Sequence, residues 1–221
     1  MKPVGVPKFI QRLFPRRLWE AETDEKKIYL TFDDGPIPIV TPWVMDQLSE
    51  YNAKGTFFCI GENIERHSDL FKRLAAAGHT IGNHTFNHLK GWKTDKYDYL
   101  ENVRLAEHSM IKYVPDVFES KKFFRPPYGK MTSSQAKLIE NAGYIIVMWN
   151  LLSYDYDASL SGEQVFKNVQ ENLGKGSIVV LHDSLKAEKN LRYVLPLMLR
   201  EYSEEGYKFC GLNDLYSATY S

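Results

Sequence analysis

Two adjacent carboxylates follow the first strong apolar run of the chain, and they are the side chains best placed for chemistry. Asp33 and Asp34 follow the apolar residues 28–30, with Thr31 and Phe32 in between, and come directly before Gly35 and Pro36. Neighbouring like charges repel each other, and proteins usually resolve this with a shared proton or a bound cation. The alternative is a plain surface turn, because Asp and Gly both favour turns.

Two imidazoles further along the chain offer ligands to such a cation. His84 and His88 are four residues apart, so both rings share one face if the loop enters a helix. With Asp34 they supply two nitrogens and one oxygen and leave coordination positions open, which is typical of a catalytic zinc or a similar divalent ion. Taken alone, the His pair has a simpler interpretation as two ordinary polar residues.

Other reactive side chains also follow strand-like runs. Arg125 and Tyr128 come after one such run, residues 149–155 after the next, and His182 with Asp183 after a third. The carboxyl ends of parallel strands meet on one face of an α/β barrel, and such folds carry their active sites there. We therefore predict that these residues form one site with the Asp and His residues above.

Strand-like and helical runs alternate along the chain, which is typical of repeated βα units. They predict an α/β fold, namely a single-domain distorted (β/α)7-8 barrel with parallel strands. Strands are expected at residues 27–32, 55–60, 79–83, 122–125, 144–149, 176–181 and 207–211, and helices at 41–52, 62–77, 95–113, 133–142, 161–173 and 189–205. Thr41 and Pro42 are expected at the N-cap and first position of the first helix.

Residues 1–26 are expected to form an N-terminal segment packed on the barrel, with residues 27–221 as the catalytic domain. The segment mixes basic and apolar side chains without a continuous apolar stretch, so it does not resemble a signal peptide and predicts a cytoplasmic location. Weak association with a membrane surface is the alternative, although Pro15 interrupts the apolar stripe. No run approaches the roughly 18 apolar residues of a membrane-spanning helix.

The overall charge excludes one class of partner. The 221 residues include 28 basic and 28 acidic side chains, so the formal net charge is zero. Nucleic acid is not expected as a partner, because its binding is driven by a surplus of positive charge. Cys59 and Cys210 lie in apolar runs, where a free cysteine usually behaves as a small buried hydrophobe, and they predict no disulfide framework.

Five motifs, in this order, resemble those of the polysaccharide deacetylases of carbohydrate esterase family 4, also called the chitooligosaccharide deacetylase homology domain. They span residues 31–36, 84–88, 125–128, 149–156 and 178–183, and the resemblance covers about residues 27–212. It implies a metal-dependent hydrolase that removes N-acetyl groups from N-acetylglucosamine-type sugars in a polysaccharide, oligosaccharide or glycan precursor. It also implies one divalent metal ion, with zinc favoured and cobalt, manganese or nickel as alternatives.

The resemblance assigns roles to residues of the first three motifs. Asp34, His84 and His88 would hold the metal, and Asp33 would be the general base. Arg125 would tether Asp33, because a guanidinium keeps a nearby carboxylate ionised.

Tyr128 of the third motif and residues of the two later motifs would complete the site. The backbone N–H of Tyr128 would stabilise the oxyanion, and His182 would protonate the departing amine. Trp149 and Val180, together with Tyr128, would wall the substrate pocket. For Trp149, simple packing in the core is an equal alternative.

The fourth motif departs from the family pattern. The family usually begins this motif with an acid that orients and tunes the catalytic His, and ends it in Asp-Trp, where this chain has Leu152 and Asp155-Tyr156. An apolar Leu152 predicts a lower pKa for His182 than an acidic neighbour would give. Asp155 or Asp183 could take the place of the missing acid.

Two rival functions remain open from the sequence. One is an amide hydrolase on a small non-sugar substrate, since a fold does not determine its substrate. The other is a catalytically silent carbohydrate-binding domain, which the missing acid at Leu152 keeps open. Retention of a candidate base and a candidate acid, Asp33 and His182, argues against this second reading. Independently of this choice, Trp92, Tyr154 and Tyr156 would form an aromatic rim on which sugar rings stack, with simple packing as an equal alternative.

Overall fold

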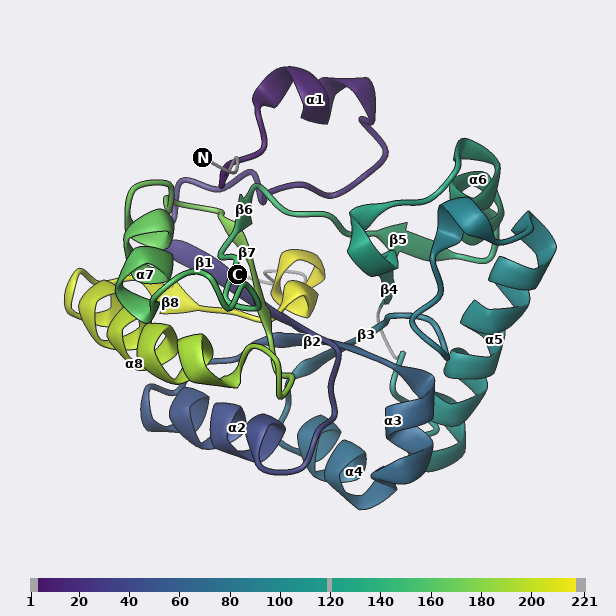
Figure 1. Ribbon diagram of the computed structural model, residues 1–221, viewed down its shortest axis with the longest axis horizontal. Coiled ribbons are helices and arrows are strands. Elements are labelled where there is room, and N and C mark those ends of the chain that lie inside the picture. The colour runs from purple at the N-terminus through teal and green to yellow at the C-terminus, as the bar shows by residue number, and fades with distance from the viewer. Residues whose placement is uncertain (1–3, 119–120, 218–221) are drawn as a thin grey trace.

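In the part of the chain that the computed structural model describes, residues 4–118 and 121–217, eight parallel strands form one curved sheet (Figure 1). The strands are β1 (Lys27–Asp33), β2 (Thr56–Cys59), β3 (Thr80–Asn83), β4 (Lys122–Phe124), β5 (Tyr144–Ile146), β6 (Leu151–Leu152), β7 (Ile178–His182) and β8 (Lys208–Phe209). Their order is β5-β4-β3-β2-β1-β7-β6, and β8 pairs with β1. The predicted α/β barrel with parallel strands is confirmed, and its sheet is open between β5 and β6.

Helices surround the outside of the sheet, while the short helix α1 stands at one end of the molecule (Figure 1). The helices are α1 (Lys8–Leu13), α2 (Val40–Glu50), α3 (Gly61–Arg66), α4 (Ser68–Ala76), α5 (Lys96–Tyr113), α6 (Ser133–Asn141), α7 (Gly162–Gln170) and α8 (Glu188–Glu204), with 3-10 turns η1 (Gly91–Lys93), η2 (Pro127–Gly129) and η3 (Leu212–Tyr216). Thr132 and Ser161 start α6 and α7 with reciprocal capping boxes.

Alternation along the strands decides which side chains point into the barrel. In β1, Ile28, Leu30 and Phe32 pack in the large cluster under the helices, whereas Tyr29 belongs to a separate cluster with residues of β2, β4 and β7. Because successive side chains of a strand point to opposite faces, Asp33 lies on the same face as Tyr29. In β7, Val179 joins the outer cluster and Ile178 the inner one, so His182 also points inward.

Two predicted details of the helices and one of the strands are wrong. The helix expected at residues 62–77 is two helices, because His67 adopts the non-helical angles φ −133° and ψ 47° between α3 and α4. Thr41 does not cap α2, which begins at Val40 after Ile39 with φ 76°. The strand expected at 144–149 ends at Ile146, and β6 was not predicted.

The N-terminal segment lies along the open edge of the sheet. Gly5 forms a bridge with Leu151 of β6, and Leu18 forms a bridge with Val147 just after β5. Trp19 is buried in the same cluster as residues of β4, β5 and α6. The segment therefore supplies the wall that the sheet lacks between β5 and β6. Among the described residues, no helix combines the length and apolar character needed to cross a membrane.

Candidate active site

Asp33 and Arg125 form a buried ion pair. Nη1 of Arg125 lies 2.7 Å from Oδ1 of Asp33 and donates to Oγ1 of Thr31 at 2.6 Å, while Nη2 donates to the Met148 carbonyl at 2.8 Å. These bonds fix the guanidinium in one orientation. Burial is the largest influence and opposes ionisation of Asp33, but the charge and hydrogen bond of Arg125, together with the charges of His84 and His182, outweigh it and hold the Asp33 pKa below its usual value. Asp33 is therefore a carboxylate at neutral pH and can accept a proton.

Asp34 turns away from Asp33 and meets the two imidazoles. It leaves β1 with φ 84°. Its Oδ1 lies 3.3 Å from Nε2 of His88 and 3.8 Å from Nε2 of His84. One donor atom from each of the three residues lies within 4.8 Å of the other two. Two imidazole nitrogens and one carboxylate oxygen fit a divalent ion of the zinc type with coordination positions left open.

The surroundings prepare both imidazoles as ligands. Nδ1 of His84 lies 2.8 Å from the Arg125 carbonyl, which can only accept a hydrogen bond. In the neutral ring Nδ1 therefore carries the proton and Nε2 offers its lone pair. Burial, reinforced by neighbouring His84, lowers the pKa of His88 to about 4, so this ring is neutral at physiological pH.

The loop that carries both His residues is not the helix that their spacing suggested. Thr85 and His88 adopt positive φ angles of 67° and 55°. The side chain of Asn83 accepts a hydrogen bond from the Thr85 N–H, and Oδ1 of Asn102 accepts from both N–H groups of residues 86–87, at 2.8 and 3.1 Å. The two rings converge because side-chain amides fix an irregular loop.

Asp183 fixes the loop that follows β1 and carries Asp34. Its Oδ1 accepts the Gly35 N–H at 3.0 Å, and the Thr41 hydroxyl donates to Oδ2 at 2.5 Å. A Cβ added to Gly35 would lie 2.0 Å from Oδ2, so only glycine fits there. Nδ2 of Asn63 donates to the Asp34 carbonyl at 2.7 Å. Asp183 therefore positions the residues that follow β1 and does not partner His182.

Asp155 is the partner of His182. Its Oδ1 lies 2.8 Å from the ring Nδ1, and its Oδ2 accepts the His182 backbone N–H at 2.7 Å. Burial is the largest influence and opposes protonation of the ring, but the charge and hydrogen bond of Asp155, together with the charges of Asp34 and Asp33, outweigh it and raise the His182 pKa to about 9. The lower pKa expected from an apolar Leu152 is therefore wrong, because Asp155, one of the two acids left open as a replacement, reaches the ring. Leu152 lines the cavity instead.

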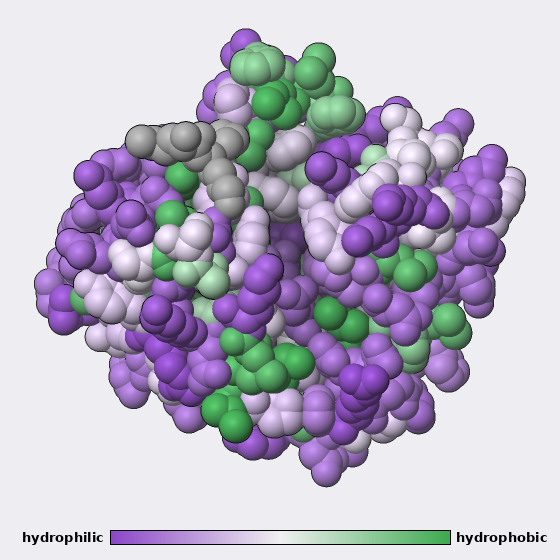
Figure 2. Space-filling view, in the orientation of Figure 1, coloured by the Kyte–Doolittle hydropathy of each residue, from purple (hydrophilic) through white to green (hydrophobic). Residues whose placement is uncertain are grey.

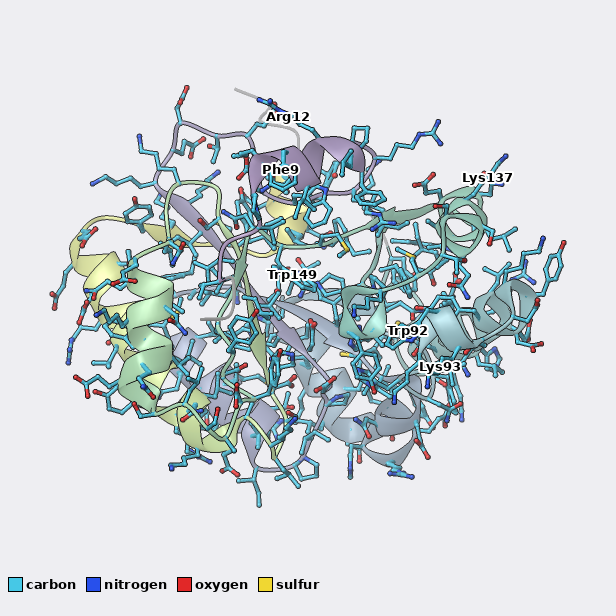
Figure 3. All side chains as sticks on the ribbon, turned by 45° about the horizontal axis from the view of Figure 1, so that its top comes forward. Phe9, Arg12, Trp92, Lys93, Lys137 and Trp149 are labelled. Atoms are coloured by element: carbon cyan, nitrogen blue, oxygen red, sulfur yellow. The ribbon has the colours of Figure 1, made fainter. Side chains whose placement is uncertain are left out.

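One cavity of about 520 Å³ brings the reactive side chains together. Its lining includes Asp33, Asp34, His84, His88 and His182. Trp149, Leu152 and Val180 form an apolar part of its lining. Trp149 lies so close to Gly129 that an added Cβ would sit 2.4 Å from the indole ring. Figure 3 shows Trp149 among the strands, away from the outer helices. The apolar part lies beside Asp33 and His182 and is suited to a small alkyl group.

Tyr128 extends the site outward. Its ring centroid lies 4.7 Å from that of His88 and 5.5 Å from that of Trp92, and the two aromatic residues are 50% and 42% exposed. Tyr128 has φ 59°, a left-handed conformation that is uncommon for a tyrosine. Of the other expected rim residues, Tyr156 lines the cavity, whereas Tyr154 lies beside Tyr156 with 6.0 Å between ring centroids.

Sequence reasoning missed the residues that support the ligands. Asn102 and Asn63 lie on α5 and α3, and Thr41 lies on α2. A search for reactive residues at the ends of strands therefore does not find their supporting role. Their signal is burial: Asn102 and Thr41 occupy buried positions of helices, where a polar side chain requires a partner.

The sequence of this chain is similar to those of several known deacetylases. A sequence profile described as polysaccharide deacetylase matches residues 20–147. A peptidoglycan-N-acetylglucosamine deacetylase of Bacillus cereus is 35% identical over 208 residues, which cover 89% of this chain and 91% of that protein. A chitooligosaccharide deacetylase of Bradyrhizobium is 30% identical over 79% of this chain and 78% of its own length. Two longer peptidoglycan deacetylases also match, and this chain spans 57% and 40% of them.

A solved structure is similar over nearly the whole chain. It is a crystal structure of a peptidoglycan N-acetylglucosamine deacetylase in complex with 4-naphthalen-1-yl-N-oxidanyl-benzamide. It is 28% identical, covers 95% of this chain and 96% of its own, and superposes with a TM-score of 0.86.

Proposed function

The chain belongs to the polysaccharide deacetylase family, and we propose that it hydrolyses the N-acetyl groups of N-acetylglucosamine units in peptidoglycan strands. The observation that carries this is the convergence, in one cavity, of a three-residue cation site, an ionised carboxylate and a protonated imidazole. Amide hydrolysis needs these components, because a water must lose a proton and the departing amine must gain one. Two relatives named for peptidoglycan favour that glycan over chitin oligomers.

Asp34, His84 and His88 are the residues that would hold the ion, and their donor set fits it. We propose zinc, with cobalt, manganese or nickel as alternatives that accept the same nitrogen and oxygen ligands. When bound, such an ion lowers the pKa of a water toward about 7 and polarises the acetamide carbonyl.

The proton acceptor is Asp33. Its carboxylate is ionised and held by Arg125, so one oxygen has a fixed direction and the other can take a proton from the attacking water. The low pKa limits its strength as a base, which suits a water that is already acidified. The backbone N–H of Tyr128 is our proposal for the donor that stabilises the oxyanion.

The proton donor is His182. Its pKa of about 9 keeps the ring protonated at neutral pH, and Asp155 holds the ring by Nδ1, so Nε2 is the atom that can protonate the departing amine. This pairing removes the main support for a silent binding domain, which was the apparent lack of an acid partner for His182.

The shape of the cavity fits an N-acetylated sugar. Val180, Trp149 and Leu152 provide an apolar recess for the acetyl methyl group. Tyr128 and Trp92 present half-exposed rings beside the His88 end of the cavity, where a neighbouring sugar of the strand can stack.

The test is acetate release from three substrates: peptidoglycan strands, a neutral N-acetylglucosamine oligomer and acetanilide as a small non-sugar amide. We expect release from both glycans, faster from peptidoglycan, and none from acetanilide. Preference for acetanilide would support the small-amide hydrolase. Binding of the oligomer without any acetate release, at saturating metal, would support the silent binding domain.

A further inference from the structure

We propose that α1 and the residues that follow it form a docking surface for a bilayer containing anionic lipid. This surface, the α1 patch, consists of the apolar residues Phe9, Leu13 and Phe14 and the basic residues Lys8, Arg12, Arg16 and Arg17. Figure 1 shows α1 at one end of the molecule, and Figure 2 shows apolar side chains gathered over it. None of the patch residues lines the active-site cavity, so the proposal does not depend on the chemistry of that site.

The apolar half of the patch is exposed although the opposite face of the helix is anchored. Phe9 and Leu13 lie one turn apart and are 67% and 68% exposed, and Phe14 is 39% exposed. Ile10, in contrast, packs against the cluster that contains buried Trp19. The segment is therefore held to the barrel by one side and presents large apolar side chains on the other. A contiguous set of such side chains on a surface marks an interaction site.

The charged half of the patch carries a positive surplus in a chain with no net charge. Residues 8–17 contain four basic and no acidic side chains. Lys8 pairs with Glu20, and Arg16 with Glu140 at 3.3 Å, while Arg12 has no ion pair within the described residues. Figure 3 shows Phe9 and Arg12 on α1 at the outer edge of the molecule.

An anionic bilayer fits this surface better than a protein partner does. Phenylalanine and leucine beside lysine and arginine on a short helix are typical of segments that lie in the membrane interface. α1 protrudes from the molecule at one end, which suits a flat and deformable partner more than a rigid protein surface (Figure 1). Pro15 follows the helix, and α1 has only six residues, so the segment lies on the bilayer and does not enter it as a span.

The experiment is co-sedimentation of the full chain with vesicles of phosphatidylcholine, with and without phosphatidylglycerol. We expect binding only to the anionic vesicles, and release at high salt. The double variant R12Q/R16Q, which removes two cations, should bind the anionic vesicles about 30-fold more weakly. Each cation near the bilayer surface contributes roughly a factor of five to the affinity. Replacing the apolar pair, F9S with L13S, should weaken it at least about tenfold.

Matched controls come from other faces of the molecule. R73Q with K189Q removes two exposed cations from α4 and α8, and L105S with I111S removes two exposed apolar side chains from α5. These controls should bind vesicles like the wild type. The patch variants should keep wild-type thermal unfolding, because they change exposed side chains.

Three results would overturn the proposal. The first is equal binding to neutral and anionic vesicles, or no binding to either. The second is loss of binding in the controls as large as in the patch variants. The third is a wild-type dimer in light scattering that becomes a monomer in F9S with L13S, which would mean that a second copy of the chain covers the patch.

Discussion

Asp33 and Asp34 are neighbours in the sequence but lie in different environments. Asp33 faces inward from β1 and is neutralised by buried Arg125. Asp34 leaves the strand in a left-handed conformation and faces His84 and His88. The repulsion between the two carboxylates is thus relieved by two separate partners, and each carboxylate keeps its own task.

Replacing Asp33 by Asn should abolish most turnover while leaving the metal site intact. The amide can still accept a hydrogen bond from Arg125 but cannot take a proton at neutral pH, and loss of a general base costs roughly 10² to 10⁴ in rate. The measurement is kcat for acetate release, with circular dichroism and metal content as controls, because Arg125 also loses its buried counter-charge. Wild-type turnover in this variant would show that Asp33 is not the base.

The pairing of His182 with Asp155 predicts a pH dependence. His182 must be protonated to act as the acid, so activity falls as the pH rises through its pKa of about 9. D155N removes the largest of the charges that raise this pKa, so the alkaline limb of kcat/KM should move to lower pH by about 1 to 3 units. A bound cation shifts both profiles in the same direction, so the difference between the two proteins is the quantity to compare.

L152D is the matched control for this prediction. Leu152 lines the cavity and His182 already has a carboxylate on Nδ1, so a new acid at 152 should lower the rate without raising the alkaline limb. An upward shift in L152D together with no shift in D155N would mean that Asp155 does not tune the ring.

The loops that carry the candidate metal ligands are irregular, and side chains from a neighbouring helix and strand end fix their shape. Asn102 of α5 binds two backbone N–H groups of the His84–His88 loop, and Asp183 after β7 binds the loop after β1. The metal site is therefore as rigid as the buried amide and carboxylate beneath it.

Asn102→Ala should weaken the metal site without touching a ligand. It leaves two loop N–H groups without their acceptor, and loss of such support typically lowers metal affinity about 10- to 100-fold. Metal affinity is measured by competition with a chelator. The control is N87A, which removes the bond that Asn102 Nδ2 donates to the Asn87 side chain but keeps Asn102 Oδ1 as the acceptor for both N–H groups. Unchanged affinity in N102A would show that the loop holds its shape alone.

Much of this arrangement could be predicted from the sequence, and the reasons differ by feature. Strand ends were visible because apolar runs stop at Asp33, Arg125 and His182, and parallel strands bring those ends together. The loop conformation around His88 was not visible, because positive φ at a non-glycine residue leaves no pattern in the sequence. The role of Asp155 was open because spacing does not show which carboxylate reaches a ring.

The N-terminal segment is part of the barrel wall as well as a surface feature. Leu18 pairs with Val147 where the sheet is open, and Trp19 is buried beside it. The sequence suggested packing or membrane contact as alternatives, and the structure shows packing on one side with apolar exposure on the other. The cytoplasmic location stays a prediction.

Trp19→Ala should destabilise the whole domain if the N-terminal segment closes the open side of the sheet between β5 and β6. Truncating a buried tryptophan typically costs about 3 to 5 kcal/mol of unfolding free energy. Phe9→Ala, at an exposed position of the same segment, should cost less than about 0.5 kcal/mol. Chemical denaturation monitored by circular dichroism measures both, and equal small effects would mean that the segment is not part of the cooperative unit.

The most direct test of the whole account is a metal titration of the chelator-stripped protein with acetate release from peptidoglycan strands as the readout. Metal-dependent deacetylation at Asp34, His84 and His88 predicts no release without metal, a linear rise with added zinc, and a plateau at about one ion per chain. H84A with H88A should show no rise in the same range. Full acetate release by the stripped protein, or an equal rise in the double variant, would contradict the account.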